Sequence, residues 1–506
     1  MFESATGSRY GSASVPGVEG THVHEVAIVG AGFGGLGMAI RLKQHGVDDY
    51  VVIERDEDVG GTWWSNSYPG CQCDIPSNLY SFSFAPNPDW DRAYPMRDQI
   101  LAYLRDCADR FGVRPHVRTS SELLDARWIA DEQRWELETS TGPVAARVLV
   151  ASPGLLSEPF TPALPGLDRF EGRAFHTAEW DHSDDLTGKR VALLGSGASG
   201  VQVVPEIQPI VERLHLFQRT PPWVIPHPDH AVATGMREVY RRVPGMQKLS
   251  RAGIYALREP MALGMTRDRR WTKLQELNAR LHLRRQVPDP ELRARLTPDY
   301  EIFCKRIILS NKWYPALQEP NVDLISSGVR ELREHSIVDG DGVEREIDTL
   351  VFATGFKPAE LPIAERIHGR EGRSLADMWA GSPEAYLGTT VTGFPNFLFI
   401  YGPNVNLAHS SIVYMLESQI AYALDALDTM RRTGAGEFDV RPAVQDAYNE
   451  ELQERLAQTV WNTGGCASWY FDRNGRNSIQ WPGFTFEYRR LTKRFDAADY
   501  RLSRSS

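Results

Sequence analysis

The stretch that decides the fold is Val26-Ala27-Ile28-Val29-Gly30-Ala31-Gly32-Phe33-Gly34-Gly35, an apolar run followed by a glycine-rich turn. The same pattern returns later as Val191-Ala192-Leu193-Leu194-Gly195-Ser196-Gly197-Ala198-Ser199-Gly200. Both turns have the form G-x-G-x-x-G between an expected strand and an expected helix. The first two glycines let the backbone bend tightly and approach a pyrophosphate, and the third lets helix and strand pack closely. The chain is therefore predicted to be an α/β protein with two Rossmann-like dinucleotide-binding domains.

One charged residue after each turn predicts which dinucleotide binds there. Glu54 lies 24 residues after Gly30, and Arg219 lies 24 residues after Gly195. A carboxylate at this place accepts hydrogen bonds from ribose hydroxyls, whereas an arginine suits a 2′-phosphate. The first site is predicted to hold FAD or NAD, and the second to hold NADP.

Length and composition exclude several other classes of protein. At 506 residues two or three domains are expected, and a net charge of −10 argues against nucleic-acid binding. Five cysteines without a C-x-x-C pair or zinc-like spacing predict neither a disulfide framework nor a metal site, and they fit a reduced, cytoplasmic compartment. No apolar run is long enough to span a membrane, and no obligate protein partner is indicated.

The chain order predicts a first domain made of two separate segments. Residues 1–20 are expected to be a disordered tail, 21–154 the first part of the FAD domain, and 155–187 a linker. Residues 188–227 and 301–385 are assigned to the NADP domain, and 386–506 to the second part of the FAD domain. Residues 228–300, rich in Arg, Leu and Met with breaks at three prolines, are predicted to be a helical insertion. Its basic face is more typical of solvated surface than of a membrane patch, and the sequence leaves contact with a membrane or partner open.

Smaller elements and three isolated features complete this interpretation. Helices are expected over residues 34–45, 97–111 and 410–430, and strands over 24–30, 50–54, 126–137 and 146–151. Asp74, a lone carboxylate, is as well explained by a turn or cap as by a site, and His176 is expected to be a packed linker histidine bonded to backbone groups. The aromatic-rich tail from Trp461 is expected to pack on the domains, with one or two side chains lining a pocket.

Two longer patterns resemble the type I Baeyer–Villiger monooxygenases. Phe170-x-Gly172-x-x-x-His176-x-x-x-Trp180-Asp181 is similar to one fingerprint of that family, and the stretch from Gly60 to Asp74 is similar to a second. The resemblance covers residues 24–495. Cys304-Lys305-Arg306 and Trp481-Pro482-Gly483-Phe484 look most like the branch that contains hydroxyacetophenone monooxygenase. Ser152-Pro153-Gly154 departs from the Ala-Thr-Gly-like turn that is usual there.

The resemblance implies a chemistry and a set of site residues. NADPH would reduce FAD, O2 would add to the flavin C4a, and the resulting peroxide would attack a ketone to give an ester or lactone. Arg306 would be the fixed cation beside that anion, and Asp74 would orient Arg306. His176 and Trp180 would relay domain movement.

The remaining site residues implied by the family are shared between the two cofactors. FAD would contact Gly30, Gly32, Phe33, Gly35, Glu54, Gly61, Thr62, Trp63, Asp74 and Tyr80, with Gln72 and Cys73 between flavin and nicotinamide. NADPH would contact Gly195, Ser196, Gly197, Ala198, Ser199, Gly200, Gln202, Arg219, Thr220, Lys305 and Arg306.

Three alternatives remain open at this point. A flavin N- or S-oxygenase shares both turns but usually has Tyr or Phe in place of Trp180 and lacks the Asp74 fingerprint. A pyridine nucleotide–disulfide reductase needs a redox cysteine pair, and Cys71-x-Cys73 has the wrong spacing. A non-catalytic flavin-binding protein leaves Lys305 and Arg306 without a task. The ketone itself is not readable, beyond an apolar substrate of moderate size.

Overall fold

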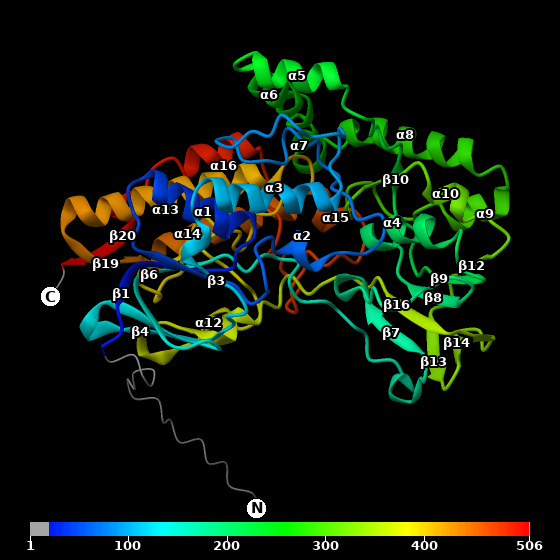
Figure 1. Ribbon diagram of the computed structural model, residues 1–506, viewed down its shortest axis with the longest axis horizontal. Helices are drawn as coiled ribbons and strands as arrows, with labels where there is room; N and C mark the ends of the chain where they lie inside the picture. The colour runs from blue at the N-terminus through cyan, green and yellow to red at the C-terminus, as the bar shows by residue number, and fades with distance from the viewer. Residues whose placement is uncertain (1–19, 505–506) are drawn as a thin grey trace, which may run out of the picture.

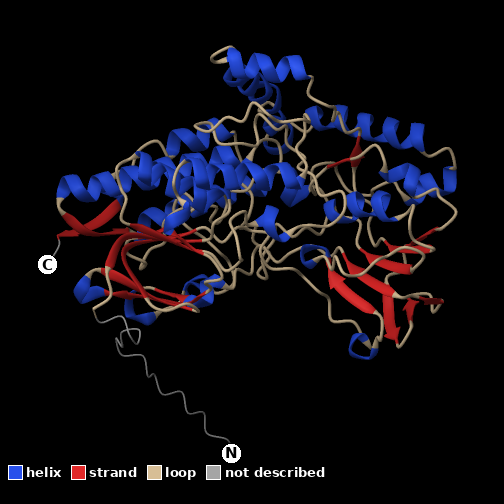
Figure 2. Ribbon diagram, in the orientation of Figure 1, coloured by secondary structure: helices blue, strands red, loops and turns tan. Residues whose placement is uncertain are grey.

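The computed structural model describes residues 20–504, so the expected tail lies outside the described residues except for Gly20. Figures 1 and 2 show two β-sheets at opposite ends of the long axis, with most helices on one side of them. This arrangement confirms the predicted α/β class with two dinucleotide-binding folds.

The first sheet is built around the first glycine-rich turn. Its order is β17-β4-β5-β6-β1-β2-β3, with β18 also paired to β6. The central strand β1 is parallel to β2 and β6 on its two sides. The strands are β1 (Val23–Val29), β2 (Tyr50–Ile53), β3 (Val117–Arg118), β4 (Leu123–Ile129), β5 (Arg134–Thr139), β6 (Val144–Ala151), β17 (Ile367–His368) and β18 (Phe397–Phe399).

Three helices cover one face of this sheet, and one expected strand is divided. The helices α1 (Phe33–Gln44), α3 (Arg97–Arg110) and α13 (Ile412–Thr433) pack together, with α1 in contact with both others. The expected strand over 126–137 is instead the hairpin of β4 and β5, because residues 130–132 form a 3₁₀ turn and Gln133 has a φ of 46°.

The second sheet is parallel throughout and contains an element that was expected to be linker. Its order is β12-β9-β8-β16-β7. Its elements are β7 (Arg173–His176), β8 (Arg190–Leu194), β9 (Arg213–Phe217), β12 (Val322–Ile325) and β16 (Thr349–Phe352), with α4 (Ala198–Ile207) and α10 (Trp313–Ala316) beside it. Arg173–His176, inside the expected linker, pairs with β16 as the edge strand.

The insertion is helical, as predicted, and its prolines mark the helix boundaries. It contains α5 (Thr234–Arg242), α6 (Met246–Arg258), α7 (Met261–Thr266), α8 (Arg270–Gln286) and α9 (Pro290–Arg295), between β10 (Val224–Ile225) and β11 (Ile308–Leu309). Pro244, Pro260 and Pro288 all lie between these helices, where the missing N–H and fixed φ of proline cost nothing.

The chain returns to the first sheet earlier than the boundary expected at 386. Ile367–His368 pairs with β4, and Leu375 and Trp379 are buried in the same apolar cluster as the first sheet. These two side chains belong to α12 (Leu375–Trp379), which follows α11 (Ile363–Arg366). A short strand at a sheet edge carries no pattern of its own, so the sequence could not reveal this pairing.

The C-terminal part closes the molecule, and its aromatic side chains mostly pack as expected. Four of these side chains are buried in one cluster, namely Trp461, Tyr470, Trp481 and Tyr488, whereas Trp469 is 40% exposed.

The remaining helices and strands are α2 (Thr62–Ser65), α14 (Pro442–Ala457), α15 (Val460–Thr463), α16 (Thr485–Leu491), β13 (Val329–Arg333), β14 (Ser336–Asp339), β15 (Glu344–Glu346), β19 (Ala435–Val440) and β20 (Tyr500–Arg504).

The cysteines differ from the expectation. Cys304 and Cys466 form a disulfide although they are 162 residues apart in sequence, with their Cα atoms 6.1 Å apart. Spacing along the chain does not report such a pair, because folding brings the two segments together. The reduced, cytoplasmic compartment stays a prediction. In the described part of the chain, no helix combines the length and the apolar character that a bilayer crossing requires.

Candidate active site

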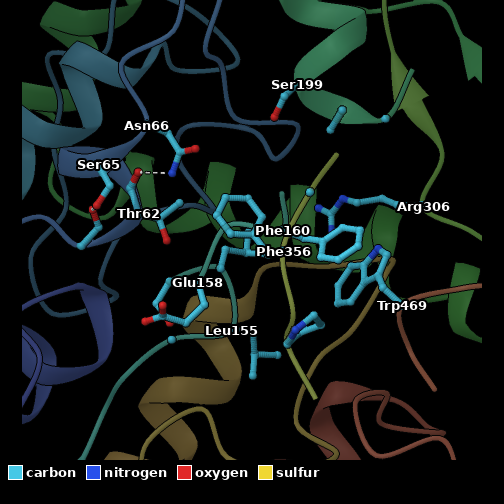
Figure 3. A pocket seen from close by; sticks show the side chains of 18 of the residues that line it. Thr62, Ser65, Asn66, Leu155, Glu158, Phe160, Ser199, Arg306, Phe356 and Trp469 are labelled. Atoms are coloured by element: carbon cyan, nitrogen blue, oxygen red, sulfur yellow. Dashed lines mark hydrogen bonds between the residues drawn. The ribbon is translucent and has the colours of Figure 1, made fainter. Parts of the chain in front are cut away.

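One cavity joins the two glycine-rich turns. It has a volume of about 1000 Å³ and is lined by residues of both sheets, the interdomain segments and the C-terminal part. All of the predicted site residues line it except Gly35 and Gly200. Figure 3 shows Arg306 and Ser199 on one side of this space and Thr62, Ser65 and Asn66 on another.

The two exceptions are packing glycines, as the third position of the motif requires. A Cβ on Gly35 would lie 1.8 Å from the carbonyl oxygen of Gly30, and one on Gly200 would lie 2.3 Å from that of Gly195. No side chain fits at either place. The close approach of helix to strand, rather than ligand contact, therefore explains both residues.

Glu54 holds the first turn in place. One carboxylate oxygen accepts the backbone N–H of Ala31 at 2.6 Å, and the other accepts that of Asp56 at 2.9 Å. The side chain is buried, and this burial raises the pKa of Glu54 above its usual value despite the two hydrogen bonds. Because a carboxylate has more lone pairs than these bonds use, it can still accept from ribose hydroxyls in the adjoining cavity.

The second turn leaves room where a phosphate would lie. Gly195 has a φ of 114°, and a Cβ there would lie 2.3 Å from the carbonyl oxygen of Ala353. A Cβ on Gly197 would meet nothing within 4 Å, so the backbone is open at the start of α4. A helix N-terminus with open space before it favours an anion.

Two cations stand beside this second turn. Burial, and then the charge of Arg219, lowers the pKa of Lys305, so the two side chains lie close enough to repel each other. The Lys305 ammonium also lies 4.9 Å from the centre of the Tyr300 ring. Within residues 20–504 neither cation has a carboxylate oxygen within 4.0 Å. Two neighbouring cations without a close counter-ion at a cavity wall fit the 2′-phosphate of NADP.

Asp74 and Arg306 form a bidentate ion pair between the two halves of the molecule. The Nε of Arg306 donates to Oδ2 of Asp74 at 2.6 Å, and Nη2 donates to Oδ1 at 2.7 Å. Burial alone would lower the pKa of Arg306 and raise that of Asp74, but each charge stabilises the other and reverses both shifts. The pair is therefore ionised, and the Asp74 carboxylate is bound by Arg306 instead of capping a helix.

The segment from Gly60 to Asp74 touches both domains. Its Trp63 indole donates to the Tyr80 hydroxyl at 3.2 Å, within the first domain. The Tyr68 hydroxyl donates to Oε1 of Gln202 in α4 at 2.9 Å, and Nε2 of Gln202 donates to the carbonyl of Gln72. The predicted FAD segment is thus tied by Gln202 to the helix of the second turn.

His176 and Trp180 do not line the cavity, in agreement with the packed role expected for His176. Its Nδ1 accepts the backbone N–H of Ala178 at 3.0 Å, and burial lowers its pKa to about 4. A neutral, buried imidazole fits a structural role. Trp180 packs edge-on against Phe175 in β7, with ring centres 5.1 Å apart.

Sequence reasoning missed an apolar wall of the cavity. Leu155, Phe160 and Phe356 lie at this wall, with Trp469 nearby (Figure 3). Leu155 and Phe160 belong to the expected linker, whose sequence has no motif that would single them out. Only Trp469 fell within a segment for which one or two pocket-lining aromatic residues were expected.

Comparison with known proteins also identifies flavin-binding monooxygenases as the relatives of this chain. The flavin-binding monooxygenase-like (FMO-like) family profile matches residues 23–366. A Baeyer-Villiger monooxygenase of Streptomyces coelicolor is 49% identical over 490 residues, 96% of this chain and 94% of that protein. One from Pseudomonas aeruginosa is 48% identical over 482 residues, 95% of this chain and 91% of that protein.

Solved structures of monooxygenases superimpose on nearly the whole length of this chain. The closed crystal structure of cyclohexanone monooxygenase superimposes with a TM-score of 0.84 at 28% identity, covering 96% of this chain and 100% of that one. A steroid monooxygenase bound to NADP gives a TM-score of 0.84 at 30% identity, with the same coverage.

Proposed function

Because the chain belongs to the flavin-binding monooxygenase-like family, we propose that it is an FAD- and NADPH-dependent Baeyer–Villiger monooxygenase. Its substrates are a small ketone and O2, and its product is an ester or lactone. The first glycine-rich turn and Glu54 hold FAD. The second turn, Arg219 and Lys305 hold NADPH, and Thr220 completes the phosphate-binding wall of the cavity.

When bound, FAD and NADPH supply the electrons and the activated oxygen, so that one atom of O2 enters beside the ketone carbonyl and the other leaves as water. The protein must stabilise negative charge on oxygen during this reaction. The guanidinium of Arg306 does so, because it stays protonated at every working pH and offers several donors. Such fixed donors stabilise a developing oxyanion without reorganising.

Asp74 positions Arg306 rather than reacting. It accepts from Nε and Nη2, which fixes the plane of the guanidinium and leaves the other N–H groups available to the cavity. The single observation that carries the proposal is this bidentate pair, since it sits in the cavity that both glycine-rich turns share. Neither a disulfide reductase nor a passive flavin carrier requires a fixed cation there.

The experiment supplies the purified enzyme with NADPH, isotopically labelled O2 and a panel of aryl and aliphatic ketones. Ester containing one labelled oxygen is expected by mass spectrometry. In Arg306→Ala, ester formation is expected to fall at least about a hundredfold, while NADPH is still oxidised. Arg306→Lys, which keeps the charge but loses the bidentate geometry, should recover only part of the activity.

Two outcomes would contradict the proposal. Undiminished ester formation in Arg306→Ala would remove Arg306 from the chemistry. Oxidation of amines or sulfides by the wild-type enzyme, with no ester from any ketone, would favour the flavin N- or S-oxygenase instead.

A further inference from the structure

The outer face of α8 carries four large apolar side chains, whereas its inner face buries Leu283 together with small or polar residues. The buried residues of this helix are Thr272, Ala279, His282 and Leu283. The opposite side presents Trp271, Leu274, Leu277 and Leu281, each between 41% and 66% exposed. Helical periodicity places these four side chains on one stripe. A helix of a water-facing surface normally has the reverse pattern.

Helix α6 also exposes large apolar side chains. Its inner side docks through Ile254 and Tyr255, which pack against the main apolar cluster, and through polar groups. Gln247 donates to Oδ1 of Asn78 at 2.9 Å, and Arg251 donates to the carbonyl of Ser81 at 2.7 Å. Its outer side presents Leu249 and Leu257, which are 67% and 80% exposed, with exposed Ala and Gly residues between them. In Figure 1, α5 and α6 project from the body and α8 runs along the same upper edge.

The same helices carry a strong positive charge in an acidic protein. Residues 234–286 contain thirteen Lys or Arg against four Asp or Glu, a net charge of +9, although the whole chain has a net charge of −10. On α8 itself Lys273, Arg284 and Arg285 are exposed, and none of them has a carboxylate oxygen within 4.0 Å in the described residues 20–504. These charges are therefore free to meet an external anion.

The geometry points to a peripheral binding surface for an anionic lipid bilayer, formed by the outer faces of α6 and α8. An apolar stripe that includes Trp and is flanked by Lys and Arg is the pattern of a helix lying in the bilayer interface. The apolar side chains enter the headgroup region, and the free cations pair with phosphate groups. A projecting edge suits a planar surface, and this inference does not depend on the oxygenation chemistry.

The test is co-sedimentation of the full-length, FAD-loaded protein with vesicles. One set contains equal parts of phosphatidylcholine and phosphatidylglycerol, and the other contains phosphatidylcholine alone. Binding to the anionic set only is expected, and it should weaken as salt is raised, because salt screens the charges. The double variant Leu274→Ser/Leu277→Ser should bind at least about tenfold more weakly, since less apolar surface is buried.

Two further variants make the test specific. Lys273→Gln/Arg284→Gln should lose binding to anionic vesicles to a similar extent. Leu124→Ser, which changes a leucine of β4 that is 43% exposed and lies outside the insertion, should bind like the wild type. The melting temperature and the bound flavin are expected to be unchanged in all three variants, which shows that they are folded.

Clear results would overturn the inference. Equal binding to neutral and anionic vesicles would show that the cations of α8 do not contribute to binding. Full binding by the α8 variants would show that the protein binds vesicles through another surface. A wild-type dimer in light scattering that becomes a monomer in Leu274→Ser/Leu277→Ser, without vesicle binding, would show that a second copy of the chain covers these helices.

Discussion

The two glycine-rich turns use the same backbone device but hold their charged partners differently. Glu54 is buried and bonded to the backbone of its own turn, whereas Arg219, at the same offset, is exposed and close to Lys305. A carboxylate that must accept from ribose hydroxyls can be built into the turn. Cations that bind a phosphate must stay free to face it. The first site is thus formed within one short segment, whereas the second also needs Lys305, which lies far along the chain.

Replacing Glu54, the charged partner of the first turn, should have the largest effect on cofactor binding. In Glu54→Ala the N–H of Ala31 loses its acceptor, which costs about 1–3 kcal/mol, and the ribose hydroxyls lose a charged acceptor worth a further 1.5–3 kcal/mol. FAD binding should weaken about a hundredfold or more, measured by flavin release on dialysis, with little change in the KM for NADPH. Glu54→Gln, which keeps an acceptor for Ala31, should be intermediate. Full retention of FAD in Glu54→Ala would mean that Glu54 only shapes the turn.

NADPH binding at the second turn should depend on the Cys304–Cys466 disulfide, because Cys304 is next to Lys305. Cys304 directly precedes Lys305 and Arg306, and Cys466 lies close to Trp469 at the cavity. Cys304→Ser should lower the free energy of unfolding by about 2–4 kcal/mol in denaturant titration. It should also raise the KM for NADPH while FAD stays bound. Cys107→Ser changes a buried free cysteine of the first domain and serves as the control for nucleotide binding. An unchanged KM in Cys304→Ser would show that folding alone holds Lys305.

Removing the partner of the second turn should affect one cofactor only. In Arg219→Ala the KM for NADPH should rise about tenfold to a hundredfold, as expected for loss of a charged hydrogen bond worth about 1.5–3 kcal/mol. The KM for NADH should change little because NADH lacks the 2′-phosphate. Steady-state kinetics with both nucleotides measures this, and Arg219→Lys should recover part of the preference. An equal rise for both nucleotides would contradict the assignment.

The smallest effect is a pH dependence that only the second site should show. Burial, followed by the charge of Arg219, lowers the pKa of Lys305, so this side chain loses its proton at a lower pH than an ordinary lysine does. Its attraction for the phosphate is complete below that pKa and is lost as the pH rises through it. The KM for NADPH should therefore increase severalfold at alkaline pH, which corresponds to about half a kcal/mol to one kcal/mol for a partly exposed charge pair. Lys305→Arg should remove this dependence because arginine stays protonated, and a wild-type KM that is flat at alkaline pH would contradict it.

The parts of the site that were predictable share one property: they depend on short stretches of sequence. The turns after β1 and β8, and the offsets of Glu54 and Arg219, were read from local patterns. The edge strand β7 and the return of the chain at β17 were missed because they depend on pairing with distant strands. Leu155 and Phe160 in the expected linker, and Phe356 after β16, were missed because an isolated apolar residue in a loop has no distinguishing pattern.

The sequence by itself determined that the protein has two dinucleotide folds of different preference, since a strand, a glycine-rich turn and a helix form within one short segment. Only the tertiary structure decided the contacts that join these two folds into a single site. Asp74 meets Arg306 across 232 residues, and Cys304 meets Cys466 across 162 residues. These partners are joined by packing between sheets, and the packing depends on the whole chain at once rather than on any stretch of it.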